Sequence, residues 1–574
     1  MSNANKDRDD RFYQEGPASL ANQFDSDAVL KSYLQRVLPA DVLAEIEPNL
    51  SRFGSRVAGD VLQMAEAAEA EEPRLIAYDP WGRRIDRIEV SHGWRELDRV
   101  AAEEGLVAIG YERRHGEYSR LHQFAKLFLF DPSSAIYSCP LAMTDGAARL
   151  IEVHGDKVLT AGALRHLTTR DPAQFWTSGQ WMTERPGGSD VGRTETVARR
   201  VGSCYQLHGD KWFTSATTSQ MAMTLARILD DQGHSTPGSR GLSLFYLETR
   251  DATGALNSMR INRLKDKLGT RALPTAELTL AGTPARLVGE PGAGVKNIAT
   301  LFNVTRIYNA VCAAAKMRRG LVLARSYAHK RLAFGKPLAE HALHVETLAA
   351  LELEARAGFH LVFSLIEMLG RIECGKSDGD DTRILRLLTP VAKLYTAKQA
   401  VQVTSEVLEC FGGAGYIEDT GLPQLLRNAQ VLPIWEGTTN VLSLDVLRAI
   451  EREQALAPFL ANLDRTLAAA NAPALDDARA RVRAARDRIA AFAVRLAGQE
   501  REQQEAAARA FAFAIARTHA AACLITQADW AVRTGRELTA VVAAQRWCRQ
   551  ELAPLPEGAL DLGGSRCLGL GDKA

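Results

Sequence analysis

The stretch WMTERPGGSDV (residues 181–191) combines an apolar start with hydroxyl side chains and two adjacent glycines. Gly187 and Gly188 allow unusual backbone angles and expose N–H donors. Thr183 and Ser189 add hydroxyls that can reach ring heteroatoms or phosphate oxygens. The stretch can therefore bind a polar cofactor. Taken alone, an ordinary surface turn explains the same residues equally well.

A second stretch, GDKWFTS (residues 209–215), has the composition of a β-strand. Side chains alternate between the two faces of a strand, so Phe213 and Ser215 share one face. An aromatic ring beside a hydroxyl can flank a flat cofactor. The alternative is that these residues are ordinary core residues of a sheet, as aromatic and β-branched residues in strands usually are.

A third stretch, IWEGTTN (residues 434–440), places Glu436 between the Trp435 indole and Gly437. A carboxylate shielded from water by aromatic surface can act as a base near neutral pH. The competing interpretation is structural: Glu436 precedes a helix that Thr438 caps.

The spacing of apolar residues divides the chain into four parts, which we predict to be domains covering residues 1–178, 179–288, 289–450 and 451–574. The first, third and fourth show helical spacing, and the second alternates as strands do, for example at 242–248 and 276–280. We expect a turn at 208–210, a small hairpin or an ordered excursion around Pro80 and Gly82, a kink or helix end at Pro390, and a helix end at 412–415.

The overall composition excludes several classes of protein. The net charge of the 574 residues is +1, which gives no global attraction to nucleic acid or an anionic membrane. No apolar run reaches the length of a membrane span. The 8 cysteines include no C-x-x-C pair, so we expect no metal cage or disulfide framework, and we predict a reducing, cytoplasmic location.

Five motifs in this order resemble the acyl-CoA dehydrogenase family. They are M-T-E-x-x-G-G-S-D (182–190), G-D-K-W-F-x-S (209–215), K-R-x-A-F-G-K-P-L (330–338), G-G-x-G-Y (412–416) and W-E-G-T-x-N (435–440). The stretches YDPWGRRIDRIEVSHGW (78–94) and CPLAMT (139–144), together with the long helical tail, resemble the AidB-like branch of that family.

The resemblance implies an α+β multidomain fold with an N-terminal helical domain, a central β-barrel-like domain, a C-terminal helical bundle and an appended helical domain. It also implies a homotetramer with one FAD per subunit. The implied reaction is α,β-dehydrogenation of an acyl-CoA thioester: Glu436 abstracts the α-proton and the β-hydride passes to flavin N5. The electron acceptor stays open.

The resemblance assigns roles by position. Residues expected to contact FAD are Met182, Thr183, Gly188, Ser189, Phe213, Ser215, Gly413, Thr438 and Asn440. Arg331 and Phe334 resemble residues that reach the FAD of a neighbouring subunit, and His341 resembles a polar contact to the same cofactor. Glu409 stands where the family usually has glutamine. Arg306 matches an arginine at the substrate entrance, and Asn303 stands where many relatives have aspartate.

Two other functions stay open. The AidB-like branch includes a protein linked to DNA alkylation damage, so a DNA-binding flavoprotein is an alternative. Residues 451–574 carry 17 Lys and Arg against 15 Asp and Glu, a thin excess for a DNA footprint. An acyl-CoA oxidase or flavin monooxygenase on the same fold is the other alternative, because no motif reports oxygen access.

Overall fold

The computed structural model describes residues 15–536 and 538–571, and begins with a layer of helices. These are α2 (Ala28–Val37), α3 (Ala40–Arg56), α4 (Asp60–Ala70), α5 (His92–Glu103), α6 (Ala108–Glu112), α7 (Ser119–Phe130), α8 (Ser138–His154), α9 (Lys157–Ala161) and α10 (Ala163–Leu167). Asp27 and Ser91 cap α2 and α5 by accepting backbone N–H groups. Every residue of α7 is buried, so this helix is the centre of the layer.

The hairpin expected around Pro80 is present as β1 (Arg74–Tyr78) and β2 (Arg84–Glu89). Asp79 Oδ1 accepts hydrogen bonds from the backbone N–H groups of Trp81 and Arg83, which closes the turn. Asp86 Oδ2 accepts from Ile261 N at 3.0 Å, so the hairpin is attached to the barrel that follows.

The middle of the chain forms a closed sheet. Its strands are β3 (Ser178–Gln180), β4 (Val197–Val201), β5 (Cys204–Ser215), β6 (Met221–Ile228), β7 (Leu242–Glu248), β8 (Met259–Leu264) and β9 (Thr275–Leu287). The order β6-β4-β5-β9-β7 returns to β6 because β7 pairs with β6, and β3 and β8 pair with β6 and β9 at the margins. The barrel-like prediction is confirmed, and both expected strands are present.

The turn predicted at residues 208–210 is wrong, because β5 runs through it. His208 and Gly209 pair with Ala281 and Leu280 of β9, with a bulge just before His208. A Cβ on Gly209 would lie 2.4 Å from Thr196 Oγ1. The glycine is therefore needed for a close approach between neighbouring segments and not for a reversal of the chain.

The helical bundle contains three long helices, α11 (Gly294–Lys330), α12 (Ala342–Glu373) and α13 (Asp380–Cys410), followed by α14 (Leu422–Ala429) and α15 (Thr439–Glu453). A short hairpin, β10 (Leu332–Ala333) and β11 (Lys336–Pro337), follows α11. The helix end expected at 412–415 is confirmed. Pro390 does not end α13, since its buried neighbours Val391 and Ala392 pack in the bundle and keep the helix intact.

The tail adds a helical layer made of α16 (Leu456–Ala469), α17 (Asp476–Ala497), α18 (Arg501–Thr534), α19 (Leu538–Cys548) and α20 (Leu562–Leu570). Among the described residues, α18 alone has the length and mean hydropathy of a membrane span. Of its apolar window, 72% is buried inside the protein, as in the core helix of a globular domain. It packs against α12, α13 and α15.

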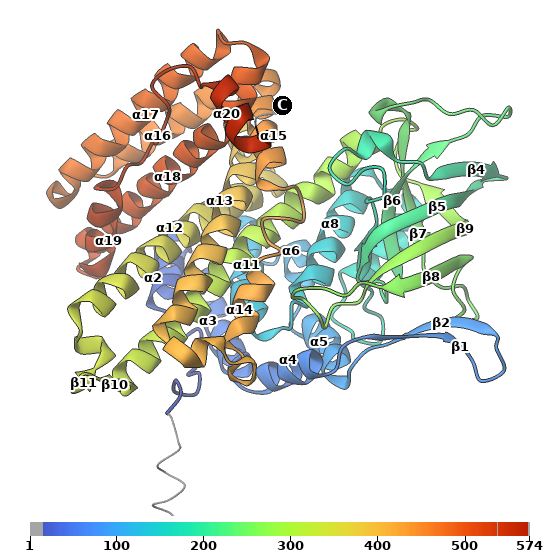
Figure 1. Ribbon diagram of the computed structural model, residues 1–574, viewed down its shortest axis with the longest axis horizontal. Coiled ribbons are helices and arrows are strands. Elements are labelled where there is room, and N and C mark those ends of the chain that lie inside the picture. Colours follow the sequence, from blue (N-terminus) through green and yellow to red (C-terminus); the bar gives the residue numbers. More distant parts are fainter. Residues whose placement is uncertain (1–14, 537, 572–574) are drawn as a thin grey trace, which may run out of the picture.

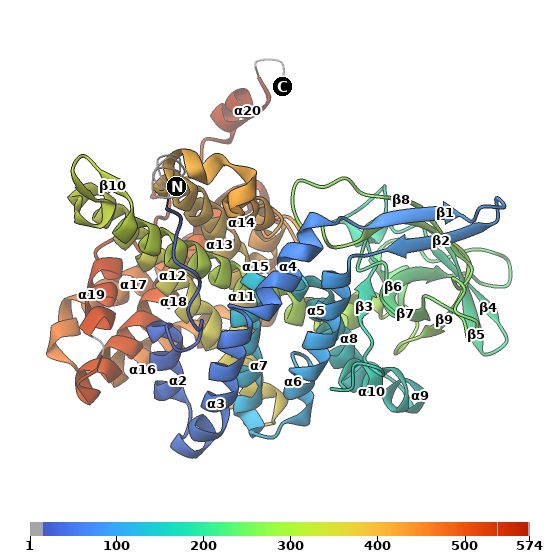
Figure 2. The ribbon, with the colours of Figure 1, turned by 90° about the horizontal axis from the view of Figure 1, so that it is seen from below.

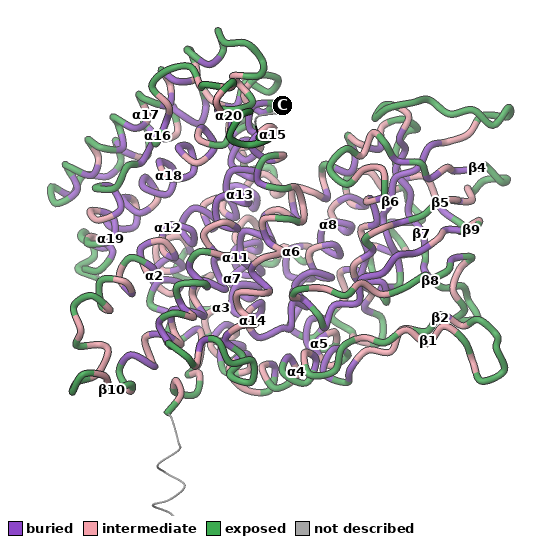
Figure 3. The backbone as a smooth tube through the Cα atoms, viewed as in Figure 1, coloured by how far each residue is buried: buried purple, intermediate pink, exposed green. Residues whose placement is uncertain are grey.

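The figures show how these parts meet. In Figure 1 the barrel lies at one end, the bundle in the middle, and the tail helices beyond α12 and α13. Figure 2 shows α2 to α7 across the face of the bundle, with the β1–β2 hairpin running out beside β8. Figure 3 shows that buried residues concentrate in the bundle and in stretches of the barrel strands.

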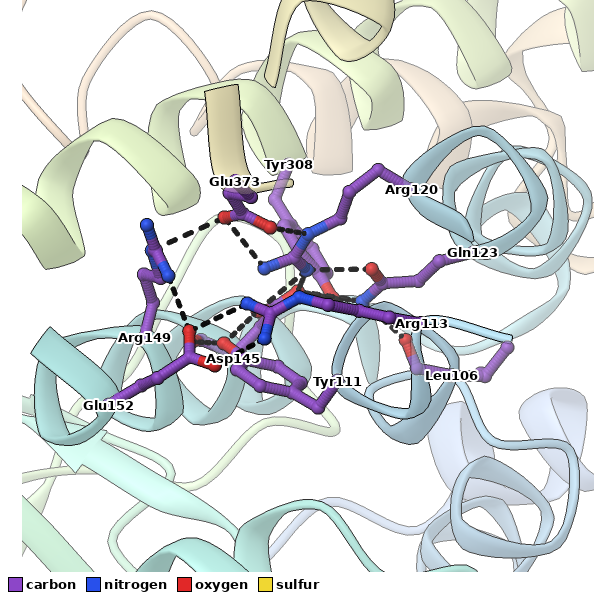
Figure 4. A network of polar contacts seen from close by, with 10 residues as sticks. All are labelled: Leu106, Tyr111, Arg113, Arg120, Gln123, Asp145, Arg149, Glu152, Tyr308 and Glu373. Carbon is purple, nitrogen blue, oxygen red and sulfur yellow. Dashed lines mark hydrogen bonds and ion pairs between the residues drawn. The ribbon is translucent and has the colours of Figure 1, made fainter. Parts of the chain in front are cut away.

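One buried polar network joins the N-terminal helices to the bundle (Figure 4). Arg120 of α7 binds Asp145 of α8 at 2.9 Å and Glu373 of α12 at 2.7 Å. Asp145 also accepts hydrogen bonds from Tyr308 of α11 and Gln123 of α7. These ion pairs and hydrogen bonds connect four helices, α7, α8, α11 and α12.

Candidate active site

The three stretches that open the sequence analysis meet at one cavity of about 450 Å³ between the barrel and the bundle. Nine of the predicted residues line it: Met182, Thr183, Gly188, Ser189, Phe213, Ser215, Arg306, Glu436 and Thr438. Since the first and last lie 256 residues apart in the chain, the fold itself creates this site.

The first two stretches are joined by a buried ion pair. Lys211 Nζ lies 2.6 Å from Glu184 Oε1, and Glu184 also accepts hydrogen bonds from Glu195 N at 2.6 Å and Thr196 Oγ1 at 2.5 Å. Burial lowers the pKa of Lys211. Trp212 N donates to Thr183 O at 2.9 Å. Glu184 and Lys211 therefore hold the glycine-rich loop against β5, a role that the sequence did not reveal.

Glu436 presents its carboxylate to the cavity. Thr305 Oγ1 of α11 donates to Glu436 Oε2 at 2.8 Å, and Gln180 Nε2 of β3 lies 3.5 Å from both carboxylate oxygens. The half-buried side chain has one short hydrogen bond and two long contacts. It retains acceptor capacity, so it can take a proton from a molecule bound in the cavity.

The structural interpretation of Glu436 also holds in part. Thr438 caps α15, accepting from Val441 N at 3.5 Å. Glu436 has a φ of +58° and Gly437 a φ of +103°, so the chain turns sharply just before the helix. The cap and the turn direct Glu436 into the cavity, and the two interpretations are compatible.

The cavity suits FAD by the chemistry of its walls. Gln180 Oε1 and Trp435 Nε1 are buried polar atoms that have no hydrogen-bond partner within residues 15–536 and 538–571. The rings of Phe213 and Trp435 and the Thr183 and Ser189 hydroxyls line the same space. Flat apolar surface with a few polar atoms at fixed positions fits a heteroaromatic ring such as isoalloxazine.

The remaining wall is mostly apolar and was missed at the sequence level. It comprises Cys139, Met143, Leu273, Phe302, Val431, Ile434 and Val441. Cys139 and Met143 lie one helical turn apart on α8, which is the spacing that could have indicated a shared face. Lys267 also lines the cavity, and burial lowers its pKa to about 8. Its amine donates to Thr270 O and Leu273 O.

Several predicted residues lie elsewhere. Arg331 and Gly413, with Glu409, line a second cavity of about 860 Å³ at the end of α11. Phe334 is 99% exposed, and His341 Nε2 contacts Ala333 O at 2.9 Å beside it. Asn440 is exposed and Asn303 half-buried. Neither of these two asparagines lines the Glu436 cavity, so one subunit does not bring all the predicted cofactor residues together.

Arg306 lines the cavity, but its charge is directed away from it. Its Nη1 lies 2.9 Å from Asp445 Oδ2, and its Nε donates to Glu436 O at 3.3 Å. The guanidinium therefore supports the turn that carries Glu436.

Family models match nearly the whole chain. They describe the AidB N-terminal domain (residues 14–171), the acyl-CoA dehydrogenase middle domain (179–283), the acyl-CoA dehydrogenase C-terminal domain (292–451) and an acyl-CoA dehydrogenase 11 C-terminal domain-like region (454–560). The chain belongs to the acyl-CoA dehydrogenase family. The family is FAD-dependent, so the predicted fold, cofactor and class of enzyme are confirmed.

Comparison with individual relatives shows which members of the family this chain resembles. Acyl-CoA dehydrogenase family member 11 of Caenorhabditis elegans is 44% identical over 95% of this chain and 90% of its own length. A crystal structure of C. elegans ACDH-11 in complex with C11-CoA has a TM-score of 0.95, with 42% identity over 98% of this chain and 97% of that one. AidB of Escherichia coli strain K12 is 31% identical over 77% of this chain and 80% of its own length.

Proposed function

We propose that the protein oxidises an acyl-CoA thioester to the α,β-unsaturated thioester, with Glu436 as the base. The observation that carries this proposal is the Glu436 carboxylate facing the cavity with acceptor capacity to spare. Glu436 takes the α-proton, and the electrons of that C–H bond form the new double bond as the β-hydride departs. FAD, when bound, supplies the acceptor for that hydride.

The surrounding residues prepare Glu436 for proton transfer. Thr305 and Gln180 orient the carboxylate from α11 and β3, so that it approaches the substrate from a fixed direction. Trp435 and Ile434 line the cavity beside it and supply apolar surface. Met182, Thr183, Gly188, Ser189, Phe213 and Ser215 would hold FAD in this cavity, with Thr438 beside it. A contact from Asn440, which does not line the cavity, stays a prediction.

We propose a medium-length aliphatic acyl chain as the substrate. The apolar wall formed by Met143, Phe302 and Val441 suits such a chain, and the similar ACDH-11 of C. elegans was crystallised in complex with C11-CoA. The prediction is checked by comparing flavin bleaching rates across a series of straight-chain acyl-CoAs.

We propose a homotetramer in which Arg331, Phe334, His341 and Gly413 complete the FAD site of a neighbouring subunit. The support is their distance from their own subunit's Glu436 cavity, together with the full exposure of the Phe334 ring. Sedimentation velocity of the holoenzyme tests the assembly.

A cytoplasmic location fits the 8 free cysteines, and cell fractionation tests it.

DNA binding through the tail receives less support. Three arginines of α17 are paired with carboxylates: Arg479 with Asp476, Arg481 with Asp477, and Arg486 with Asp464. Paired arginines offer less charge to phosphates. Glu436 would serve a dehydrogenase and an oxidase alike, since both remove the α-proton, and the rate at which air reoxidises the reduced protein separates these two.

The decisive experiment replaces the base. Glu436→Gln keeps the size of the side chain and removes its ability to take a proton. The variant should bind FAD, yet its flavin should be bleached by acyl-CoA at least about a hundredfold more slowly than in the wild type. Reduction by dithionite should be unaffected. Bleaching at the wild-type rate would show that Glu436 is not the base.

A further inference from the structure

Three consecutive backbone carbonyls at Glu436 accept hydrogen bonds from cationic side chains. Lys393 Nζ of α13 donates to Trp435 O at 2.6 Å and to Gly437 O at 2.7 Å. Arg306 Nε of α11 donates to Glu436 O at 3.3 Å. The carbonyls of the turn therefore point away from the cavity and towards the bundle, while the Glu436 side chain lines the cavity.

This turn needs external support. Glu436 is a non-glycine residue in the left-handed region, at φ +58°, a conformation that persists only where the surroundings determine it. A Cβ on Gly437 would lie 2.8 Å from Leu442 Cδ2, so the chain is also tightly packed against α15. Lys393 holds the turn on both sides of the residue that bears the carboxylate.

Lys393 is costly to bury. The side chain is fully buried, and among the described residues no carboxylate lies within ion-pair distance of its amine. Burial lowers its pKa to about 7, while the negative charge of Glu436 opposes this effect. An apolar side chain of the same length could fill the space without this cost. Packing alone therefore does not account for a lysine at this position.

Other charged groups around the turn are accounted for. Arg306 from α11 is paired with Asp445 of α15, which also binds Arg386 of α13. Cys139 from α8 has a pKa raised by burial and by the charge of Glu436. Lys267, on the other side of the cavity, donates to backbone carbonyls. Lys393 differs from Arg306 in that no carboxylate of the described residues is ion-paired with it.

We propose that Lys393 is a positioning residue for Glu436: its amine fixes the turn at residues 435–437 and so holds the carboxylate in the direction from which it accepts the α-proton. This inference rests on the proposed function, since it assigns the support of the same base. It goes beyond it by naming a residue that touches neither the cavity nor its contents.

The test is flavin bleaching by decanoyl-CoA, measured in stopped flow over a range of substrate concentrations, with FAD content and dithionite reduction measured in parallel. Lys393→Met should retain FAD and lose at least about tenfold in the limiting bleaching rate, while the half-saturating concentration of decanoyl-CoA stays within about twofold of the wild-type value. Lys393→Arg, which keeps donors for the two carbonyls, should recover most of that rate.

Lys126→Met is the control for loss of a buried lysine outside the site. Lys126 donates to Glu104 O at 2.7 Å, is also ion-paired with Glu104 Oε2 at 2.7 Å, and does not line the cavity. Its loss should lower thermal stability and leave the bleaching rate of the folded protein unchanged. Lys393→Gln, which keeps a side-chain donor without charge, provides a second test if Lys393→Met does not fold: its limiting bleaching rate should also fall below that of the wild type.

The outcomes separate two claims. If the wild type bleaches, Glu436→Gln does not, and the Lys393 variants retain the wild-type rate, the inference about Lys393 is overturned and the proposed function stands. If Glu436→Gln bleaches as fast as the wild type, the proposed function is wrong, and the role of Lys393 falls with it.

Discussion

Two polar clusters in this protein use the same kinds of side chain for opposite purposes. In the network of Figure 4, Asp145 accepts from Arg120, Gln123, Tyr111 and Tyr308, and none of its oxygens is without a donor. At the cavity, Glu436 has one short hydrogen bond, and the neighbouring Trp435 Nε1 is buried without a partner in the described part of the chain.

The difference lies in how completely each carboxylate is satisfied. A buried carboxylate with four donors is fixed and cannot accept a proton from a ligand without breaking the network. A carboxylate that faces a cavity with spare acceptor capacity can. The two clusters are also connected through α11, since Tyr308 in the network lies one helical turn from Thr305 at the site. The saturated network thus fixes a helix that the reactive carboxylate depends on.

Breaking the network should affect stability most. Arg120→Met leaves Asp145 buried without its cation and Glu373 with only the longer contact to Arg149 at 3.4 Å, which should cost about 3–5 kcal/mol. We expect a lower urea midpoint, while the folded fraction still binds FAD and bleaches. Arg99→Met, at an exposed ion pair with Glu103, should cost less than about 1 kcal/mol. Equal effects of the two variants would show that the network does not stabilise the fold.

Features of the site that depend on residues close together in the chain could be predicted from the sequence. The chemistry of Glu436 follows from its neighbours, Trp435 and Gly437, and strand alternation placed Phe213 and Ser215 on one face, as the cavity lining bears out. The family resemblance added the order of the domains. These inferences need only residues close together in the chain.

The remaining contacts depend on packing between distant segments. Thr305 lies 131 residues before Glu436 in the middle of a long helix, and Lys393 appears in the sequence as an ordinary helical cation. The turn expected at residues 208–210 was wrong because Gly209 serves the close approach of Thr196, which precedes β4, and residue spacing does not report such a contact. Periodicity shows which face of an element is apolar, but not which element meets it.

Lowering the pH should destabilise the fold first through His122, which precedes Gln123 of the network on α7. Burial, with the nearby charge of Lys126, lowers the pKa of His122 to about 3. The ordinary value is about 6.5, so the unfolded chain binds a proton that the folded protein does not, and stability falls as pH drops from about 6.5 towards 3. Between about pH 7 and pH 5 this one group should cost about 2 kcal/mol.

His122→Gln tests that expectation, because the amide can still donate to Asn49 Oδ1, which His122 Nε2 contacts at 3.1 Å. Urea midpoints at the two pH values should differ less in the variant than in the wild type. An identical pH dependence in both proteins would mean that other groups cause the acid sensitivity.

The smallest expected effect lies at the reactive cluster itself. Thr305→Val keeps the shape of the side chain and removes the 2.8 Å hydrogen bond to Glu436, worth about 1 kcal/mol. Because that bond orients the carboxylate, the bleaching rate at the pH optimum should fall about fivefold. Thr305→Ser, which restores the hydroxyl, should recover the rate. If Thr305→Val bleaches at the wild-type rate, the hydrogen bond from Thr305 is not needed to orient the Glu436 carboxylate. The backbone turn alone then sets that orientation.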